Sequence, residues 1–197
     1  MTAPAPELRI LVCGAGDRGD DRAPMAAISQ ILPALPSGLR SRIEVRRCPQ
    51  LDVTDVINVA EGETCLVIDT VVGIEPGSIV RLSLVELARR AGGIAPRSTH
   101  ALSIDDTLQV AEAVRGSLPP GAFVGIGGRW FGYGERFSRS VTAGLPALCT
   151  AIREAVEELL PVFAGDPVDG MRDQPDGASG PASDPGSNPS TDRTGEA

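Results

Sequence analysis

The chain has 197 residues, with 18 arginines, no lysine, 26 acidic residues and a single histidine, His100, so its net charge is −8. One histidine excludes a three-histidine zinc centre or a Cys2His2 finger within one chain. The charge balance lacks the basic footprint of nucleic-acid-binding proteins, so we expect no nucleic-acid partner.

Composition divides the chain into two parts. Residues 1–164 hold the apolar segments and are enough for one domain. Residues 165–197 are rich in Gly, Pro, Ser and Asp, and their seven acids and two arginines give a net charge of −5. Such a segment cannot bury enough apolar surface to offset its chain entropy, so we predict a disordered acidic tail.

The cysteines and the N-terminus indicate the compartment. There is no CxxC pair, and Cys13, Cys48 and Cys65 lie in apolar, strand-like runs that favour small buried side chains. The first residues lack the basic start and long apolar run of a signal peptide, and no stretch of 18 apolar residues occurs. We expect a monomeric, reduced, cytoplasmic protein with no membrane segment.

Strand-like and helix-like segments alternate along residues 8–160. In chain order, the patterns predict a strand at Leu8–Cys13, a helix at Ala23–Leu35, a strand at Ile43–Arg47, a helix at Leu51–Val59, strands at Cys65–Asp69 and Ser78–Leu82, helices at Leu84–Arg90 and Ile104–Val114, a strand at Ala122–Ile126, and a helix at Val141–Leu160. This alternation favours an α/β fold, a three-layer sandwich with about five strands in a mostly parallel, twisted sheet flanked by helices.

Several helix ends carry capping residues. Asp20 or Asp21 can cap the first helix, and Thr54 or Asp52 the second. Ser103 is the expected cap of the helix before the fifth strand, and Gly92-Gly93 the expected stop of the helix before it.

Ligands of such sheets gather beyond the carboxyl ends of the strands, so the loops that follow each strand matter most. Residues 14–21 (GAGDRGDD) follow the first strand, and Gly14, Gly16 and Gly19 match the GxGxxG dinucleotide fingerprint. Asp20 and Asp21, however, occupy the helix start where a pyrophosphate would bind, and their charge favours a cation instead. One acid is enough for a cap, which leaves the other to be explained.

Two further groups follow later strands. Asp69 ends the very apolar third strand, where an acid is expensive to bury unless it is paired or bound; the alternative is a turn-forming aspartate before Gly73. His100 lies in a loop before a helix, where a structural role is the alternative. Together with Asp21 they would form an O,O,N set that suits a divalent transition metal, or an acid, a base and an orienting group around water.

A glycine-rich loop with aromatic side chains follows the fifth strand. Four of the six aromatic residues of the chain lie between Trp130 and Phe137. Either they form an adaptable recognition surface or they fold back over the core.

Four features, in order, resemble the hydrogenase maturation proteases, endopeptidases that trim the C-terminus of the nickel–iron hydrogenase large subunit. They are the GAGDRGDD loop, similar to the family's GNxxRGDD; the acid of Val67-Ile68-Asp69-Thr70; the Ser-x-His-x-Leu segment at residues 98–102; and Val124-Gly125-Ile126 followed by Gly134-x-x-Phe137-Ser138. The resemblance covers about residues 8–160.

The resemblance implies a five-stranded sheet sandwiched by helices and an endopeptidase acting on a [NiFe]-hydrogenase large-subunit precursor. Asp21, Asp69 and His100 map onto the family's metal-contacting residues, which recognise nickel already installed in the precursor, so no intrinsic cofactor is implied. It leaves open whether a carboxylate or the nickel activates water.

The chain also departs from the family pattern. Ala15 replaces the asparagine of the first loop, Arg22 and Pro24 replace small residues, and Gly127-Gly128 replaces a Gln-Pro or Glu-Pro pair. Two alternatives therefore stay open: a non-proteolytic assembly or binding module of the same fold, and a nucleotide-binding protein that uses Gly14, Gly16 and Gly19.

Overall fold

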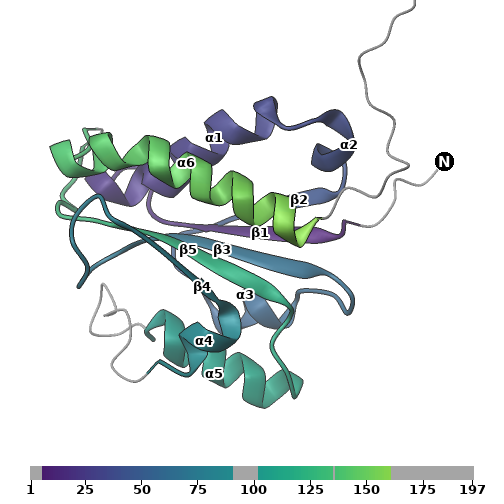
Figure 1. The fold of residues 1–197 in the computed structure, drawn as a ribbon. Helices are drawn as coiled ribbons and strands as arrows, with labels where there is room; N and C mark the ends of the chain where they lie inside the picture. The colour runs from purple at the N-terminus through teal and green to yellow at the C-terminus, as the bar shows by residue number, and fades with distance from the viewer. Residues whose placement is uncertain (1–5, 91–101, 135, 161–197) are drawn as a thin grey trace, which may run out of the picture.

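A five-stranded sheet runs through the computed structural model, which describes residues 6–90, 102–134 and 136–160 (Figure 1). The strands are β1 (Leu8–Cys13), β2 (Ile43–Cys48), β3 (Thr64–Val71), β4 (Ile79–Ser83) and β5 (Gly121–Gly127). Their order is β2-β1-β3-β5-β4, and every neighbouring pair is parallel except β4 and β5. The predicted α/β fold with a mostly parallel sheet is confirmed.

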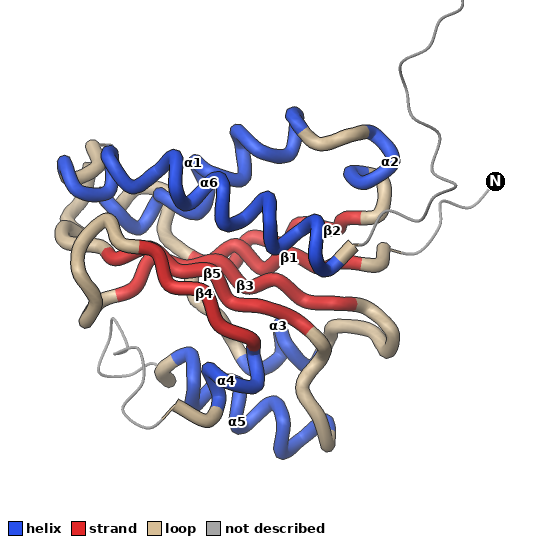
Figure 2. Tube along the Cα trace, in the orientation of Figure 1, coloured by secondary structure: helices blue, strands red, loops and turns tan. Residues whose placement is uncertain are grey.

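Helices cover both faces of this sheet (Figure 2). They are α1 (Ala23–Ile31), α2 (Ser37–Arg40), α3 (Val53–Ile57), α4 (Leu84–Ala88), α5 (Ile104–Arg115) and α6 (Arg139–Leu159), with 3-10 turns at Gly19–Arg22 and Leu32–Ala34. α1 and α6 pack on one face, and α3, α4 and α5 pack on the other. Because both faces are covered, the central strand β3 is buried at every position after its first residue.

Helix ends follow local chemistry, with three corrections. The first helix ends at Ile31 and not at Leu35; Pro33, which has no backbone N–H to donate, lies in the 3-10 turn Leu32–Ala34 that follows. The predicted helices at Leu51–Val59 and Leu84–Arg90 are shorter, as the bounds of α3 and α4 show.

The expected caps of two helices are confirmed. The Asp52 side chain accepts a hydrogen bond from the backbone of Thr54, and Asp55 reciprocates in a capping box. The Ser103 hydroxyl accepts from the backbone N–H of Asp106 at the start of α5. The short helix α2 was not predicted.

The core has two parts, one on each face of the sheet. The part under α1 and α6 is aliphatic, with Ile10, Ile68 and Ile152 fully or almost fully buried. The other part lies under α3, α4 and α5 and contains Cys13, Cys48 and Cys65, so the prediction that these cysteines are buried is confirmed.

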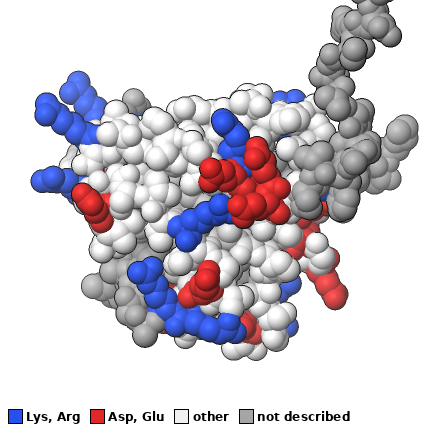
Figure 3. All heavy atoms as spheres, viewed as in Figure 1, with Lys and Arg blue, Asp and Glu red and all other residues white. Residues whose placement is uncertain are grey.

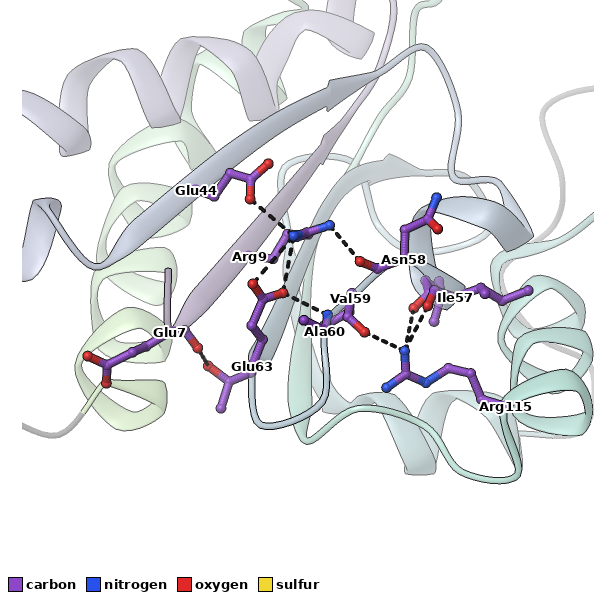
Figure 4. Close-up of polar contacts among 11 residues, drawn as sticks. Glu7, Arg9, Glu44, Ile57, Asn58, Val59, Ala60, Glu63 and Arg115 are labelled. Carbon is purple, nitrogen blue, oxygen red and sulfur yellow. Dashed lines mark hydrogen bonds and ion pairs between the residues drawn. The ribbon is translucent and has the colours of Figure 1, made fainter. Parts of the chain in front are cut away.

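A cluster of polar side chains lies at the end of the sheet where β1 and β3 begin (Figure 4). Arg9 on β1 donates to the Asn58 carbonyl at 2.7 Å and pairs with Glu63 at 3.2 Å. Arg115, at the end of α5, donates to the carbonyl of Ile57 at 2.8 Å, which places a cation at the C-terminus of α3. These contacts fix the end of the sheet opposite the loops that follow β1, β3 and β5.

Some predictions concern other parts of the chain. His100 and the Gly92-Gly93 stop fall in 91–101, and the acidic tail 165–197 falls in 161–197; both ranges lie outside the described residues. Within the described ranges, no helix has the length and apolar character needed to cross a bilayer.

Candidate functional site

The loop after β1 folds back tightly on Asp21. Gly14 has φ +130°, and a Cβ there would lie 2.2 Å from the backbone oxygen of Asp21, so the approach requires glycine. Oδ2 of Asp21 accepts a hydrogen bond from the backbone N–H of Ala15 at 2.8 Å. Asp21 is therefore buried at the carboxyl end of β1, with a carboxylate oxygen fixed by the loop it belongs to.

Asp20, its neighbour, has a different role. It is fully buried, and its carboxylate accepts three backbone N–H groups: from Arg129 and Trp130 at 2.9 Å each, and from Ser138 at 2.6 Å. Its own N–H donates to the Trp130 carbonyl at 2.8 Å. Asp20 thus ties the loop after β1 to both ends of the loop between β5 and α6.

The surroundings of Asp20 keep it ionised. Burial raises its pKa, but the hydrogen bonds donated by Ser138, Arg129 and Trp130 together outweigh this and hold the pKa below its usual value. Neither Asp20 nor Asp21 caps α1, contrary to the prediction; residue Arg22 holds the cap position without a side-chain hydrogen bond. Instead, the Asp21 carboxylate binds within its own loop, and the Asp20 carboxylate joins that loop to the loop between β5 and α6.

Asp69 lies inside β3, two residues before the strand ends at Val71, and not at its end as predicted. Only 3 % of the residue is exposed. Burial raises its pKa to about 8; the N–H of Thr70, which donates to Oδ1 at 2.7 Å, lowers the pKa, and neighbouring Cys48 raises it further. At neutral pH this carboxyl group holds its proton unless a cation replaces it.

Two thiols lie near Asp69, a feature that we did not predict. Cys13 on β1 pairs in register with Cys48 on β2, and it follows Val12, the partner of the residue that precedes Asp69 on β3. Both cysteines belong to the core under α3, α4 and α5. The signal in the sequence was present: each thiol ends its strand, and parallel strands end at the same edge of a sheet.

The aromatic loop divides its side chains between the core and the surface. Phe137 packs against the core under α6, whereas Trp130 and Tyr133 are 42 % and 74 % exposed. The Arg18 guanidinium stacks on the Tyr133 ring at 4.8 Å and donates to its hydroxyl at 3.2 Å. Gly19 lies under the Trp130 ring, where a Cβ would meet the ring at 2.2 Å. Phe137 therefore folds back on the core, while Trp130 and Tyr133 stay exposed, and their role in recognition stays a prediction.

The two acids of the predicted set lie in neighbouring segments of one sheet edge. The hydroxyl of Thr70 donates to the Asp20 carbonyl at 3.0 Å, which joins the residue after Asp69 to the residue before Asp21. The third member, His100, lies outside the described residues. Within the described ranges, no three His, Cys, Asp or Glu side chains are grouped so that they could hold a metal ion.

This geometry does not favour the nucleotide alternative. In the Gly14–Gly19 loop, the N–H of Ala15 is occupied by the Asp21 carboxylate, in the region where a phosphate would be expected. The loop therefore already contains its own anion. This edge carries two buried acids, Asp69 and Asp21, in neighbouring segments.

Comparison with solved structures gives the same fold in several proteins. The hydrogenase maturating endopeptidase HybD from E. coli superposes with a TM-score of 0.61 at 16 % identity, covering 77 % of this chain and 93 % of that one. The [NiFe] hydrogenase maturation proteases HybD and HycI from Thermococcus kodakarensis give TM-scores of 0.53 and 0.56, at 22 % and 18 % identity. They cover 75 % and 77 % of this chain, and 97 % and 92 % of their own.

No protein-family model matches the chain, and no curated protein matches it in sequence. The structural similarity to hydrogenase maturation proteases thus extends over most of the chain at low sequence identity.

Proposed function

We propose that this chain is an endopeptidase that removes the C-terminal extension of a nickel-loaded [NiFe]-hydrogenase large-subunit precursor. The observation that carries the proposal is Asp69, a carboxylic acid buried within β3 at the edge where Asp21 also lies. Burying an acid lowers the stability of the folded protein, because burial opposes the charged form, so a buried acid at a sheet edge favours a functional role. The fold shared with the HybD and HycI proteases supports the same reading.

In this proposal, Asp21, Asp69 and His100 recognise the nickel that the precursor carries. Asp69 would exchange its proton for the cation, because its pKa of about 8 keeps it neutral when no cation is present. Asp21 enters the site with one oxygen already fixed by Ala15 N–H, which restricts how its carboxylate can turn. The imidazole supplies the nitrogen that borderline transition metals accept readily. No resident cofactor is required, since the metal belongs to the substrate.

The test is incubation of the full chain with nickel-loaded precursor, followed by mass measurement of the precursor. We expect cleavage by wild type and loss of cleavage with Asp21→Asn, Asp69→Asn or His100→Ala. Asp17→Asn is the matched control, because this exposed acid lies in the same loop. Cleavage retained in all three site variants would refute the assignment of these residues to the site. Cleavage of metal-free precursor would refute the role of nickel.

A second candidate is a non-proteolytic assembly or binding module of the same fold. The exposed Trp130 and Tyr133 favour it, because aromatic side chains supported by arginine are common at protein interfaces. Stable complex formation with the precursor, without loss of mass, would decide for this alternative. Stabilisation by dinucleotides and not by Ni²⁺ in a thermal-shift screen would instead restore the nucleotide alternative.

A further inference from the structure

The end of the molecule that carries the proposed site also carries a group of exposed arginines, with one exposed acid, Asp17, next to Arg18. Exposed arginines rise from the two loops that Asp20 joins and from the start of α6. We name the following set the arginine–aromatic surface: Arg18, Arg129, Trp130, Tyr133, Arg136 and Arg139. Figure 3 shows basic side chains projecting from the end of the molecule at which α6 begins.

The fold concentrates these charges. The N–H groups of Arg129 and Ser138 donate to the same Asp20 carboxylate. The two ends of the loop between β5 and α6 therefore lie close together, which brings Arg129 near Arg139, the residue after Ser138. Arg129, Arg136 and Arg139 form no ion pair with any residue in the described ranges. Exposed arginines that form no ion pair with the residues described by the structure favour an anionic ligand.

An anionic segment exists within the same chain. Residues 165–197 carry seven acids and two arginines, a net charge of −5, whereas residues 1–164 carry 19 acids and 16 arginines, a net charge of −3. Few large apolar side chains occur in this segment, so its composition gives it no core of its own. We propose that residues 165–197 dock on the arginine–aromatic surface of their own chain.

The length of the chain permits this contact. α6 begins at the surface and ends at Leu159, and its 21 residues span about 31 Å at 1.5 Å per residue. A chain spans at most about 3.3 Å per residue, so from Leu160 the sequence can place Asp176 up to about 53 Å away and Asp184 up to about 79 Å away. Both distances exceed the length of α6, whereas Asp166 falls short, at about 20 Å even when fully extended. Asp169 reaches it only in a fully extended chain.

Weak contacts are enough, because the segment is tethered. A linker of this length maintains an effective concentration in the millimolar range, so a contact with a dissociation constant of about 1 mM is half occupied.

The chain contains a built-in reporter. Trp130 is its single tryptophan and is 42 % exposed within the surface. Acrylamide quenching of the full chain therefore measures how much the segment covers Trp130, in about 20 mM and about 500 mM NaCl, where screening differs strongly. We expect the wild-type quenching constant to rise by about 1.5-fold at the higher salt, because screening releases the segment.

Matched pairs identify the contact. Asp176→Asn with Asp184→Asn should remove most of the salt-dependent rise, whereas Asp166→Asn with Asp169→Asn, which neutralises the same charge, should keep it. On the surface, Arg129→Gln with Arg139→Gln should remove the rise.

Three results would overturn the proposal: no rise in wild type, equal behaviour of the two aspartate pairs, or a rise that disappears on dilution, which would indicate contact between molecules. The assay needs neither nickel nor precursor, so its failure would leave the proposed function untouched, and failed cleavage would leave the docking untouched.

Discussion

Replacing Asp20 by asparagine should destabilise the protein strongly, although the side chains differ by one oxygen. The carboxylate accepts from Arg129, Trp130 and Ser138. The amide oxygen of asparagine can still accept from Arg129 and Trp130, but its NH2 group then faces the N–H of Ser138, donor against donor, where an oxygen now lies at 2.6 Å. One charge-assisted hydrogen bond is lost and a buried donor is left unsatisfied.

The magnitude follows from these two terms. A hydrogen bond to a charged group contributes about 1.5–3 kcal/mol, and an unsatisfied buried donor costs about 1–3 kcal/mol, so the free energy of unfolding should fall by about 2.5–6 kcal/mol. In a domain of this size, the melting temperature should fall by about 10 °C. Urea unfolding followed by circular dichroism measures the change. Asp17→Asn, an exposed acid in the same loop, is the control and should stay within about 0.5 kcal/mol.

The pH dependence gives an independent check. The pKa of Asp20 is held below its usual value in the folded protein, so its stabilising contribution is complete above the unfolded pKa of about 4 and is lost as the pH falls further. The difference between wild type and Asp20→Asn should therefore be constant near neutral pH and shrink in acid. A loss below about 1 kcal/mol, or a difference that does not shrink in acid, would refute the role of Asp20 as the link between the loops.

Three other predictions concern single positions. Because the pKa of Asp69 is raised to about 8 in the folded protein, the folded protein keeps a proton that the unfolded protein loses near pH 4, so wild-type stability should fall as the pH rises from about 4 to about 8. Urea unfolding of Asp69→Asn should show no such slope and a higher stability than wild type at about pH 8. An unchanged slope would contradict the prediction. Gly19→Ala should cost more than about 2 kcal/mol, since its Cβ would meet the Trp130 ring at 2.2 Å and its φ is +23°, whereas Gly16→Ala, with open space around it, should be nearly neutral. Arg115→Met should cost about 1–2 kcal/mol in the same assay, by freeing the carbonyl groups at the end of α3; no change would show that solvent replaces the guanidinium.

Much of the fold could be predicted from the sequence because its signals are local. Apolar runs such as Leu8–Cys13 form strands, and the capping residues Asp52 and Ser103 act within one helical turn of themselves. Element ends were less predictable where two local preferences compete. Apolar periodicity continued past Ile31, for example, but the 3-10 turn that contains Pro33 follows there.

The candidate site was predictable only in part. Gly14 and the adjacent acids indicated a loop that matters at a strand end, and Asp21 and Asp69 do lie on one edge of the sheet. The different roles of Asp20 and Asp21 were not predictable, because Asp20 acts on Arg129 and Ser138, more than 100 residues away in the chain. No periodicity or local spacing encodes such a contact.

The elements, the layered architecture and the residue types at the carboxyl edge of the sheet could be predicted from the amino-acid sequence, because hydrophobic period and turn chemistry operate over a few residues. Three features emerged only with the folded chain: which carboxylate joins the loops, the burial of Asp69 with its raised pKa, and the pairing of Cys13 with Cys48. Burial, pKa and strand register arise when distant segments meet, so they are properties of packing.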